Sequence, residues 1–119
     1  MTFALLALAL LARAEHEDEA ARRFDAAVSR YNRGDLDGAL AEFERVQELA
    51  PRAAVLFNIG MIQAALGRAA EAYTSFNAVL ATPGSLSAER LARARAQLRA
   101  LEPKLGRLKV RVRPSGATV

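Results

Sequence analysis

Apolar residues recur at helical spacing over most of the chain, and the pattern changes at both ends. Phe24, Val28 and Tyr31, for example, lie at i, i+4 and i+7. This spacing places apolar side chains on one face of a helix. Residues 3–12, by contrast, form an unbroken apolar run, and close to the C-terminus the period becomes two. The pattern therefore predicts a helical body with a segment of a different kind at each end.

The helical body contains an internal repeat of 33 residues. The positions that match at this offset are Gly34 with Gly67, Ala39 with Ala72, Phe43 with Phe76, Val46 with Val79, Phe24 with Phe57, and Val28 with Met61. Self-similarity at a period of this length is typical of helical repeat proteins. Each unit closes near a proline, Pro51 or Pro83, where a helix is expected to end. We predict two repeats, at about residues 20–52 and 53–85.

Each repeat is predicted to be two helices joined by a tight turn. In the first repeat the turn falls at residues 32–35, where Gly34 can take a positive φ at little cost. Ala39 is small enough to let the two helix backbones come close. Because about three repeats are usually needed to bury a continuous core, a capping helix is also required. We expect it at residues 87–105, with Ser87 as its N-cap.

The repeats resemble the tetratricopeptide repeat family. The shared features are a small residue in the first helix, a turn glycine, an alanine and an aromatic residue in the second helix, and a closing proline. The stretches that carry them are Leu56-Phe57-Asn58-Ile59-Gly60, Leu66-Gly67-Arg68 and Glu71-Ala72-Tyr73-Thr74-Ser75-Phe76. The first repeat departs from the family at Arg23 and Arg30, as suits a terminal repeat whose outer face meets water. The resemblance implies an all-α, tetratricopeptide-like solenoid of helical hairpins over residues 15–105.

The N-terminal apolar run predicts a signal peptide at residues 1–14. The run reads FALLALALLA, and Ala12-Arg13-Ala14 is a small-x-small triplet after which cleavage is expected. The run is about half of the ~20 residues needed to cross a bilayer. A membrane anchor and a buried first helix are the alternatives. We expect an exported protein that is periplasmic or envelope-associated. The preference for Arg over Lys indicates a bacterial source.

Residues 106–119 are predicted to begin a β segment. Three apolar residues alternate with three basic ones, in the order Leu108, Lys109, Val110, Arg111, Val112 and Arg113. Alternation of this kind predicts a half-buried strand, here followed by a turn, and so a short C-terminal β-hairpin fragment. The stretch LKVRVRPSGATV resembles the opening of a PEGA-type β domain, a small module of bacterial surface proteins, of which only the first part is present.

Charge is distributed unevenly behind the formal net charge of +4. Residues 15–83 carry 7 basic and 11 acidic side chains, whereas residues 84–119 carry 9 basic and 2 acidic ones. In an exported chain this basic segment is expected to meet an anionic envelope surface or acidic proteins, and no nucleic acid. Lys109, Arg111 and Arg113 are the candidate contacts with anionic lipid or cell-wall polymer. The other interpretation is a solvated face that protects a sheet edge.

Residue types suited to catalysis or metal binding are sparse. The chain has no Cys, and its one imidazole, His16, stands beside the expected cleavage site. No Gly-rich phosphate loop and no metal-ligand spacing is found. We therefore expect no enzymatic activity, no cofactor and no small-molecule substrate.

The family resemblance implies a binding surface formed by the first helices of successive repeats. Carried over to this sequence, its apolar floor comprises Phe24, Val28, Tyr31, Phe57 and Met61, and Asn58 matches an asparagine that often binds a peptide backbone. The expected function is a scaffold that binds a protein or peptide partner. In a second interpretation these residues are simply core. In a third, the helices only space a basic β module that anchors the protein to the envelope.

Overall fold

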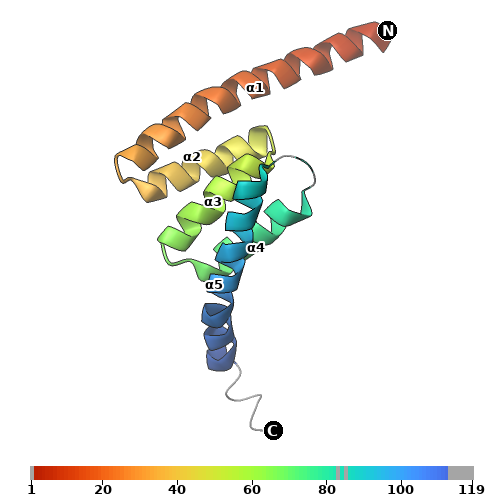
Figure 1. The fold of residues 1–119 in the computed structure, drawn as a ribbon. Helices are drawn as coiled ribbons and strands as arrows, with labels where there is room; N and C mark the ends of the chain where they lie inside the picture. The colour runs from red at the N-terminus through yellow and green to blue at the C-terminus, as the bar shows by residue number, and fades with distance from the viewer. Residues whose placement is uncertain (1, 83, 85, 113–119) are drawn as a thin grey trace. The chain divides into compact units, whose positions relative to one another are not determined.

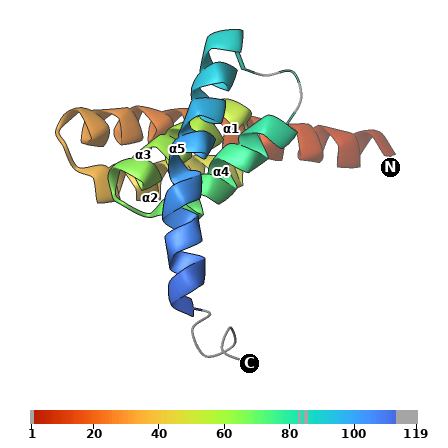
Figure 2. The same cartoon turned by 60° about the horizontal axis from the view of Figure 1, so that its bottom comes forward.

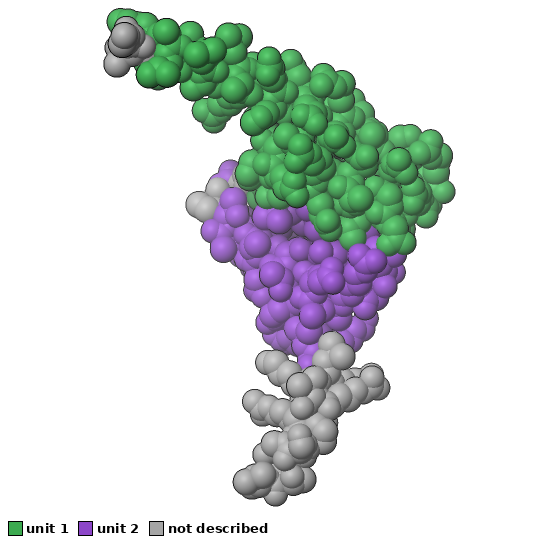
Figure 3. Space-filling model, turned by 180° about the vertical axis from the view of Figure 1, so that it is seen from behind, with its two compact units in different colours: residues 1–55 green, residues 56–119 purple. Residues whose placement is uncertain are grey.

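The structure, a computed structural model, describes residues 2–82, 84 and 86–112. These residues form five helices and no strand, so the predicted all-α class is confirmed for them. The helices are α1 (Thr2–Asn32), α2 (Leu36–Leu49), α3 (Ala53–Ala65), α4 (Ala69–Ala81) and α5 (Ala88–Val112) (Figure 1). The chain divides into two compact units, residues 1–55 and 56–119 (Figure 3).

The first unit contains α1, α2 and the start of α3. Helices α1 and α2 pack side by side as a helical hairpin (Figure 2). Ala27 and Ala39 are fully buried between them, because small side chains allow the two backbones to come close. Phe24 and Phe43 meet edge to face, with ring centroids 5.5 Å apart and planes at 77°. Such aromatic pairs add specific geometry to the apolar area that they bury.

The turn between α1 and α2 is fixed by one glycine and one carboxylate. Gly34 has a φ of +81°, as expected from its place after a helix end. Asp35 caps α2, since its Oδ1 accepts a hydrogen bond from the Gly38 backbone N–H at 3.0 Å. Arg30 donates to the other carboxylate oxygen at 2.8 Å. These hydrogen bonds hold the pKa of Asp35 below its usual value, with the Gly38 N–H as the main cause and Arg30 as the next.

The second unit contains most of α3, together with α4 and α5. Its core consists of Phe57, Ala72, Phe76, Val79, Ala94 and Leu101. Phe57 and Phe76 again meet edge to face, at 6.0 Å and 71°. Helix α5 packs against α4, as expected of a capping helix. The predicted N-cap Ser87 accepts a hydrogen bond from the Arg90 N–H at 3.2 Å.

One polar pair is buried in the second unit. The Ser75 hydroxyl of α4 donates to Gln63 Oε1 of α3 at 2.6 Å, and both side chains are buried. Among the described residues, no buried side-chain nitrogen or oxygen lacks a hydrogen-bond partner. The burial of these two polar groups is therefore compensated.

The 33-residue repeat has a counterpart in structure. The pair Phe24 and Phe43 corresponds to Phe57 and Phe76, one pair in each unit. The turns correspond as well, because the Gly34 N–H donates to the Tyr31 carbonyl at 3.0 Å and the Gly67 N–H to the Ala64 carbonyl at 3.1 Å. Gly67 has a φ of +79°, close to that of Gly34. The same aromatic contact and the same turn thus recur at the offset found in the sequence.

The C-terminal end of the chain differs from its predicted form, whereas the signal peptide at residues 1–14 stays a prediction. Helix α1 runs without a break through Ala14, where the signal peptide was expected to end. Helix α5 runs to Val112, so residues 108–112 are helical where the alternation had predicted a strand. The apolar residues Leu101, Leu105, Leu108 and Val112 are also spaced at four, three and four, which suits a helix equally well. The rest of the expected hairpin, residues 113–119, lies outside the described residues.

Candidate functional site

The first half of α1 carries apolar side chains that nothing in its unit covers. Phe3 and five leucines between residues 5 and 11 are 61–84% exposed, and every described side chain before Glu19 is exposed. The first buried side chain along α1 is that of Ala20. Helix α1 has 31 residues and α2 has 14, so about half of α1 lacks a partner helix in this unit. Among the described residues, no helix combines the length and the apolar character that crossing a membrane requires.

Three of the predicted binding residues lie on one face of α1. Phe24 is half-buried against Phe43, whereas Val28 is 37% exposed and Tyr31 is 52% exposed. Their spacing of four and three residues makes them neighbours along the helix surface. This face therefore presents an apolar strip to its surroundings within the first unit.

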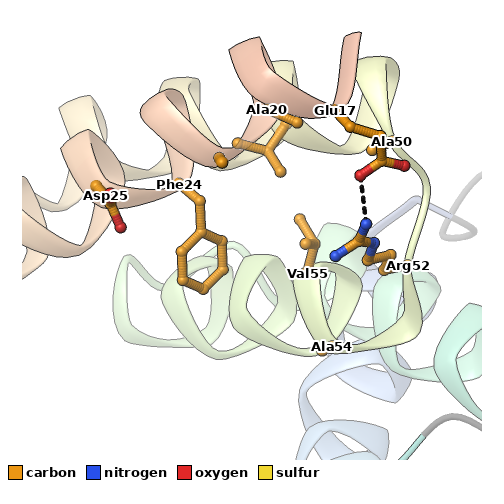
Figure 4. A pocket seen from close by; sticks show the side chains of 10 residues that line it. Glu17, Ala20, Phe24, Asp25, Ala50, Arg52, Ala54 and Val55 are labelled. Atoms are coloured by element: carbon orange, nitrogen blue, oxygen red, sulfur yellow. Dashed lines mark hydrogen bonds and ion pairs between the residues drawn. The ribbon is translucent and has the colours of Figure 1, made fainter. Parts of the chain in front are cut away.

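A hollow of about 350 Å³ opens beside this strip in the first unit. Its apolar lining includes Ala20, Ala21, Phe24, Val46, Ala50 and Val55. Figure 4 shows the side chains of Phe24, on α1, and Val55, in the first turn of α3, pointing into this space. We call this space the α1 hollow. It is mostly apolar inside, as expected for a site that takes an apolar group.

Three charged side chains also border the α1 hollow: Glu17, Asp25 and Arg52. Arg52 Nη2 donates to Glu17 Oε2, and this pair lies at one side of the hollow (Figure 4). Asp25, at the other side in the same view, is exposed and makes no ion pair with any described residue. Sequence reasoning did not single out these three residues. For Glu17 and Asp25 the sequence did contain a signal: they lie eight residues apart with Ala21 between them, a spacing that puts all three on one face of α1. No such signal was available for Arg52.

The other three predicted binding residues lie on α3 in the second unit. Phe57 is 5% exposed and belongs to the core of that unit. Met61 is half-buried and packs against the same core, and Asn58 is half-buried. At Phe57 the structure therefore agrees with the interpretation that this residue is core.

Arg23, which departs from the family pattern, joins the two helices of the first unit. Its guanidinium donates to Glu19 at 3.1 Å and to Glu42 of α2 at 3.3 Å. The hydrogen bond from Arg23 lowers the pKa of Glu19, and the hydrogen bond to Glu19 raises the pKa of Arg23. A shallow polar depression lined by these side chains, Arg22 and Ala26 is therefore occupied by its own ion pairs.

The predicted basic contacts lie at the end of α5 and beyond it. Lys109 and Arg111 fall within the helix, and Arg113 lies outside the described residues. Earlier in α5, four basic side chains are exposed and make no ion pair with any described residue, namely Arg90, Arg95, Arg99 and Lys104. Arg93 approaches Glu89 at 3.8 Å.

Comparison of the chain with protein-family models, with curated proteins and with solved structures finds no match. Within the part of the chain that the structure describes, no group of three or more His, Cys, Asp or Glu side chains is placed to hold a metal ion. The α1 hollow and the exposed strip beside it are the features on which a function can be argued.

Proposed function

We propose that this protein is a non-enzymatic interaction scaffold that binds a protein or peptide segment on the exposed face of α1. The observation that carries the proposal is the α1 hollow beside the apolar strip of Phe24, Val28 and Tyr31. The free energy falls when another apolar group displaces water from an apolar hollow and from exposed apolar side chains beside it. An extended or helical peptide supplies such a group.

The recurring turn and aromatic pair support a tetratricopeptide-like origin of the two hairpins. The turn and the aromatic pair are each built from residues that match at an offset of 33. Their geometry is similar in the two units. In the family that the sequence resembles, first helices line the binding face. The first unit's α1 takes that role in this proposal.

Export is the second part of the proposal. The exposed apolar residues 3–11 and the Ala12-Arg13-Ala14 triplet support a leader that directs the chain to the bacterial envelope. A helix that is apolar on all sides is unfavourable in water, so this segment requires a nonpolar environment or removal. The scaffold would then act in the periplasm or at the envelope.

Selection from a displayed library of random peptides tests the scaffold proposal. The full chain and a Val28→Ser/Tyr31→Ser variant are used as baits, because both side chains are exposed and their replacement leaves the core intact. Thermal unfolding followed by circular dichroism verifies that the variant folds. We expect peptides that bind the wild-type chain and are lost with the variant. Equal recovery by both baits would contradict a binding face on α1.

The exposed basic side chains of α5 favour a second candidate function, contact with an anionic envelope surface. Arg95 and Arg99 have no acidic partner among the described residues, so their charge is available to a lipid headgroup or polymer. Such binding weakens steeply with salt. Flotation with phosphatidylglycerol vesicles at low and high salt is the measurement. Arg95→Gln/Arg99→Gln should reduce it, and Arg22→Gln/Arg33→Gln, which removes the same charge from the first unit, should not.

A further inference from the structure

The charge around the α1 hollow is not balanced. Glu17 is neutralised by Arg52, whereas Asp25 has no ionic partner among the described residues. Residues 15–55 carry ten acidic and six basic side chains, so this part of the unit has a net negative charge as well. A negative rim attracts cations and raises their local concentration near an apolar opening. The occupant that fits this combination has an aliphatic group beside a positive charge.

The size of the α1 hollow limits what can enter. A volume of about 350 Å³ lies at the low end of ~300–1,000 Å³ for ligand sites, so it suits one or two side chains rather than a folded surface. Glu17 and Asp25 are eight residues apart on α1, which is about 12 Å at 1.5 Å per residue. An extended peptide covers that length with about four residues.

We propose that the α1 hollow recognises a basic, aliphatic peptide segment. An aliphatic side chain fills the hollow between Phe24 and Val55, and a lysine or arginine of the same segment pairs with the Asp25 carboxylate. The inference rests on the proposed function, since it names the class of peptide that the scaffold binds. It commits to a cationic partner because Asp25 is the carboxylate at the hollow that no described residue neutralises.

Three fluorescent hexapeptides test this assignment against the full chain. The first alternates leucine and lysine, the second leucine and glutamate, and the third serine and lysine. Fluorescence anisotropy at low ionic strength measures each dissociation constant. We expect the leucine–lysine peptide to bind, and the other two to bind at least about tenfold more weakly, because each loses either the charge or the apolar contact.

Two variants with matched controls locate the binding. Asp25→Asn removes the charge and should raise the dissociation constant of the leucine–lysine peptide about threefold to fivefold, as for the loss of one exposed ion pair. Glu44→Gln removes another exposed carboxylate of the same unit, one that pairs with no described residue, and should have no effect. Ala21→Leu fills the hollow from an exposed position and should abolish binding, whereas Ala41→Leu, at an exposed position of α2 that does not line the hollow, should not.

Each remaining outcome overturns the assignment in a recognisable way. Equal binding of the lysine and glutamate peptides, both lost with Ala21→Leu, would leave the scaffold intact and remove the preference for a cation. Leucine–lysine binding that neither Asp25→Asn nor Ala21→Leu reduces would place the site elsewhere on the chain. If this peptide does not bind below ~1 mM, the assignment fails. If the peptide library also gives no binder that depends on Val28 and Tyr31, the proposed function fails with it.

Discussion

Gly60 on α3 lies close against the ring of Phe76. A β-carbon placed there would be 3.0 Å from Cε1 and Cζ of the fully buried Phe76 ring, so the packed ring would have to shift by a few tenths of an ångström. We expect Gly60→Ala to destabilise the second unit by about 1–3 kcal/mol, the usual cost of overpacking a core. Urea unfolding followed by circular dichroism measures the change.

Gly106 provides the control for this substitution. It lies inside α5 with nothing within 4 Å of a β-carbon placed on it. Gly106→Ala should therefore stabilise the chain by about 0.5–1 kcal/mol, the difference in helix propensity between the two residues. Two alanine variants with the same sign of change would show that the contact with Phe76 does not limit position 60.

The lowered pKa of Asp35 makes the stability of the folded chain depend on pH. Its pKa is lowered in the folded chain, so the unfolded chain binds the proton more tightly. The stabilisation is present above the ordinary pKa of about 4 and is lost as the pH falls through that value toward the folded pKa. Asp35→Asn keeps a capping oxygen but loses the charge that Arg30 contacts. We expect a lower melting temperature than wild type at pH 7, and a difference that narrows as the pH falls below about 4.

Other carboxylates, such as Glu19, titrate in both proteins, so the difference between the two melting curves isolates Asp35. A difference that is the same at both ends of the pH range would mean that the Asp35 charge contributes nothing to folding. In that case the cap would act through its hydrogen bond to Gly38 alone.

At the scale of whole elements, α3 and α4 are joined by a polar contact inside an apolar interface. Ser75→Ala leaves the buried oxygen of Gln63 without its donor, which should cost about 1–3 kcal/mol. Gln63→Met in the same chain removes the unsatisfied group, and part of the loss should be recovered. Urea unfolding of the two single variants and the double variant completes a thermodynamic cycle. Additive losses would show that the two side chains do not depend on each other.

The hairpins could be predicted because their signals are local. Gly34 and Gly67 have the positive φ expected of turn residues, and Ala39 and Ala72 are fully buried as expected. A helix end and an apolar stripe are determined by residues within a few positions of one another. The 33-residue period also shows each of these signals twice in the sequence.

The C-terminal end of the chain was less predictable, because its pattern suits more than one element. Leu108 and Val112 fit a strand by alternation and a helix by their spacing from Leu105. A strand also needs partners for its backbone, and none is present among the described residues, whereas a helix satisfies its own hydrogen bonds. At the other end, Ala12-Arg13-Ala14 consists of strong helix formers, so α1 continues through the expected cleavage site.

The candidate site was predictable only in part. Val28 and Tyr31 are exposed on α1, as a binding face requires, but Phe57 lies in the core. Period alone does not distinguish a buried stripe from an exposed one, since both are apolar at the same spacing. The pairing of Glu17 with Arg52 joins residues 35 apart in sequence, so it could not be read before the fold was known.

For the molecule as a whole, the apolar start of α1 is a feature without a packing role in its unit. Its side chains are exposed from Phe3 to Asp18, so their removal takes no contact from the buried core. We expect a chain that begins at Glu15 to have the same melting temperature as the full chain. Its acidic first turn, Glu15 to Asp18, also suits the positive end of the helix dipole.

Circular dichroism measures the melting temperatures of the two chains, and analytical ultracentrifugation measures their self-association. The shorter chain should keep the unfolding transition and lose any self-association, because the exposed Leu and Phe side chains of residues 3–11 are what drive association in water. A full chain that is as monodisperse as the shorter one, together with a fall in melting temperature on truncation, would mean that residues 3–12 pack against the folded body. Residues 3–12 would then be part of a structural helix, and the proposed export would lose its support.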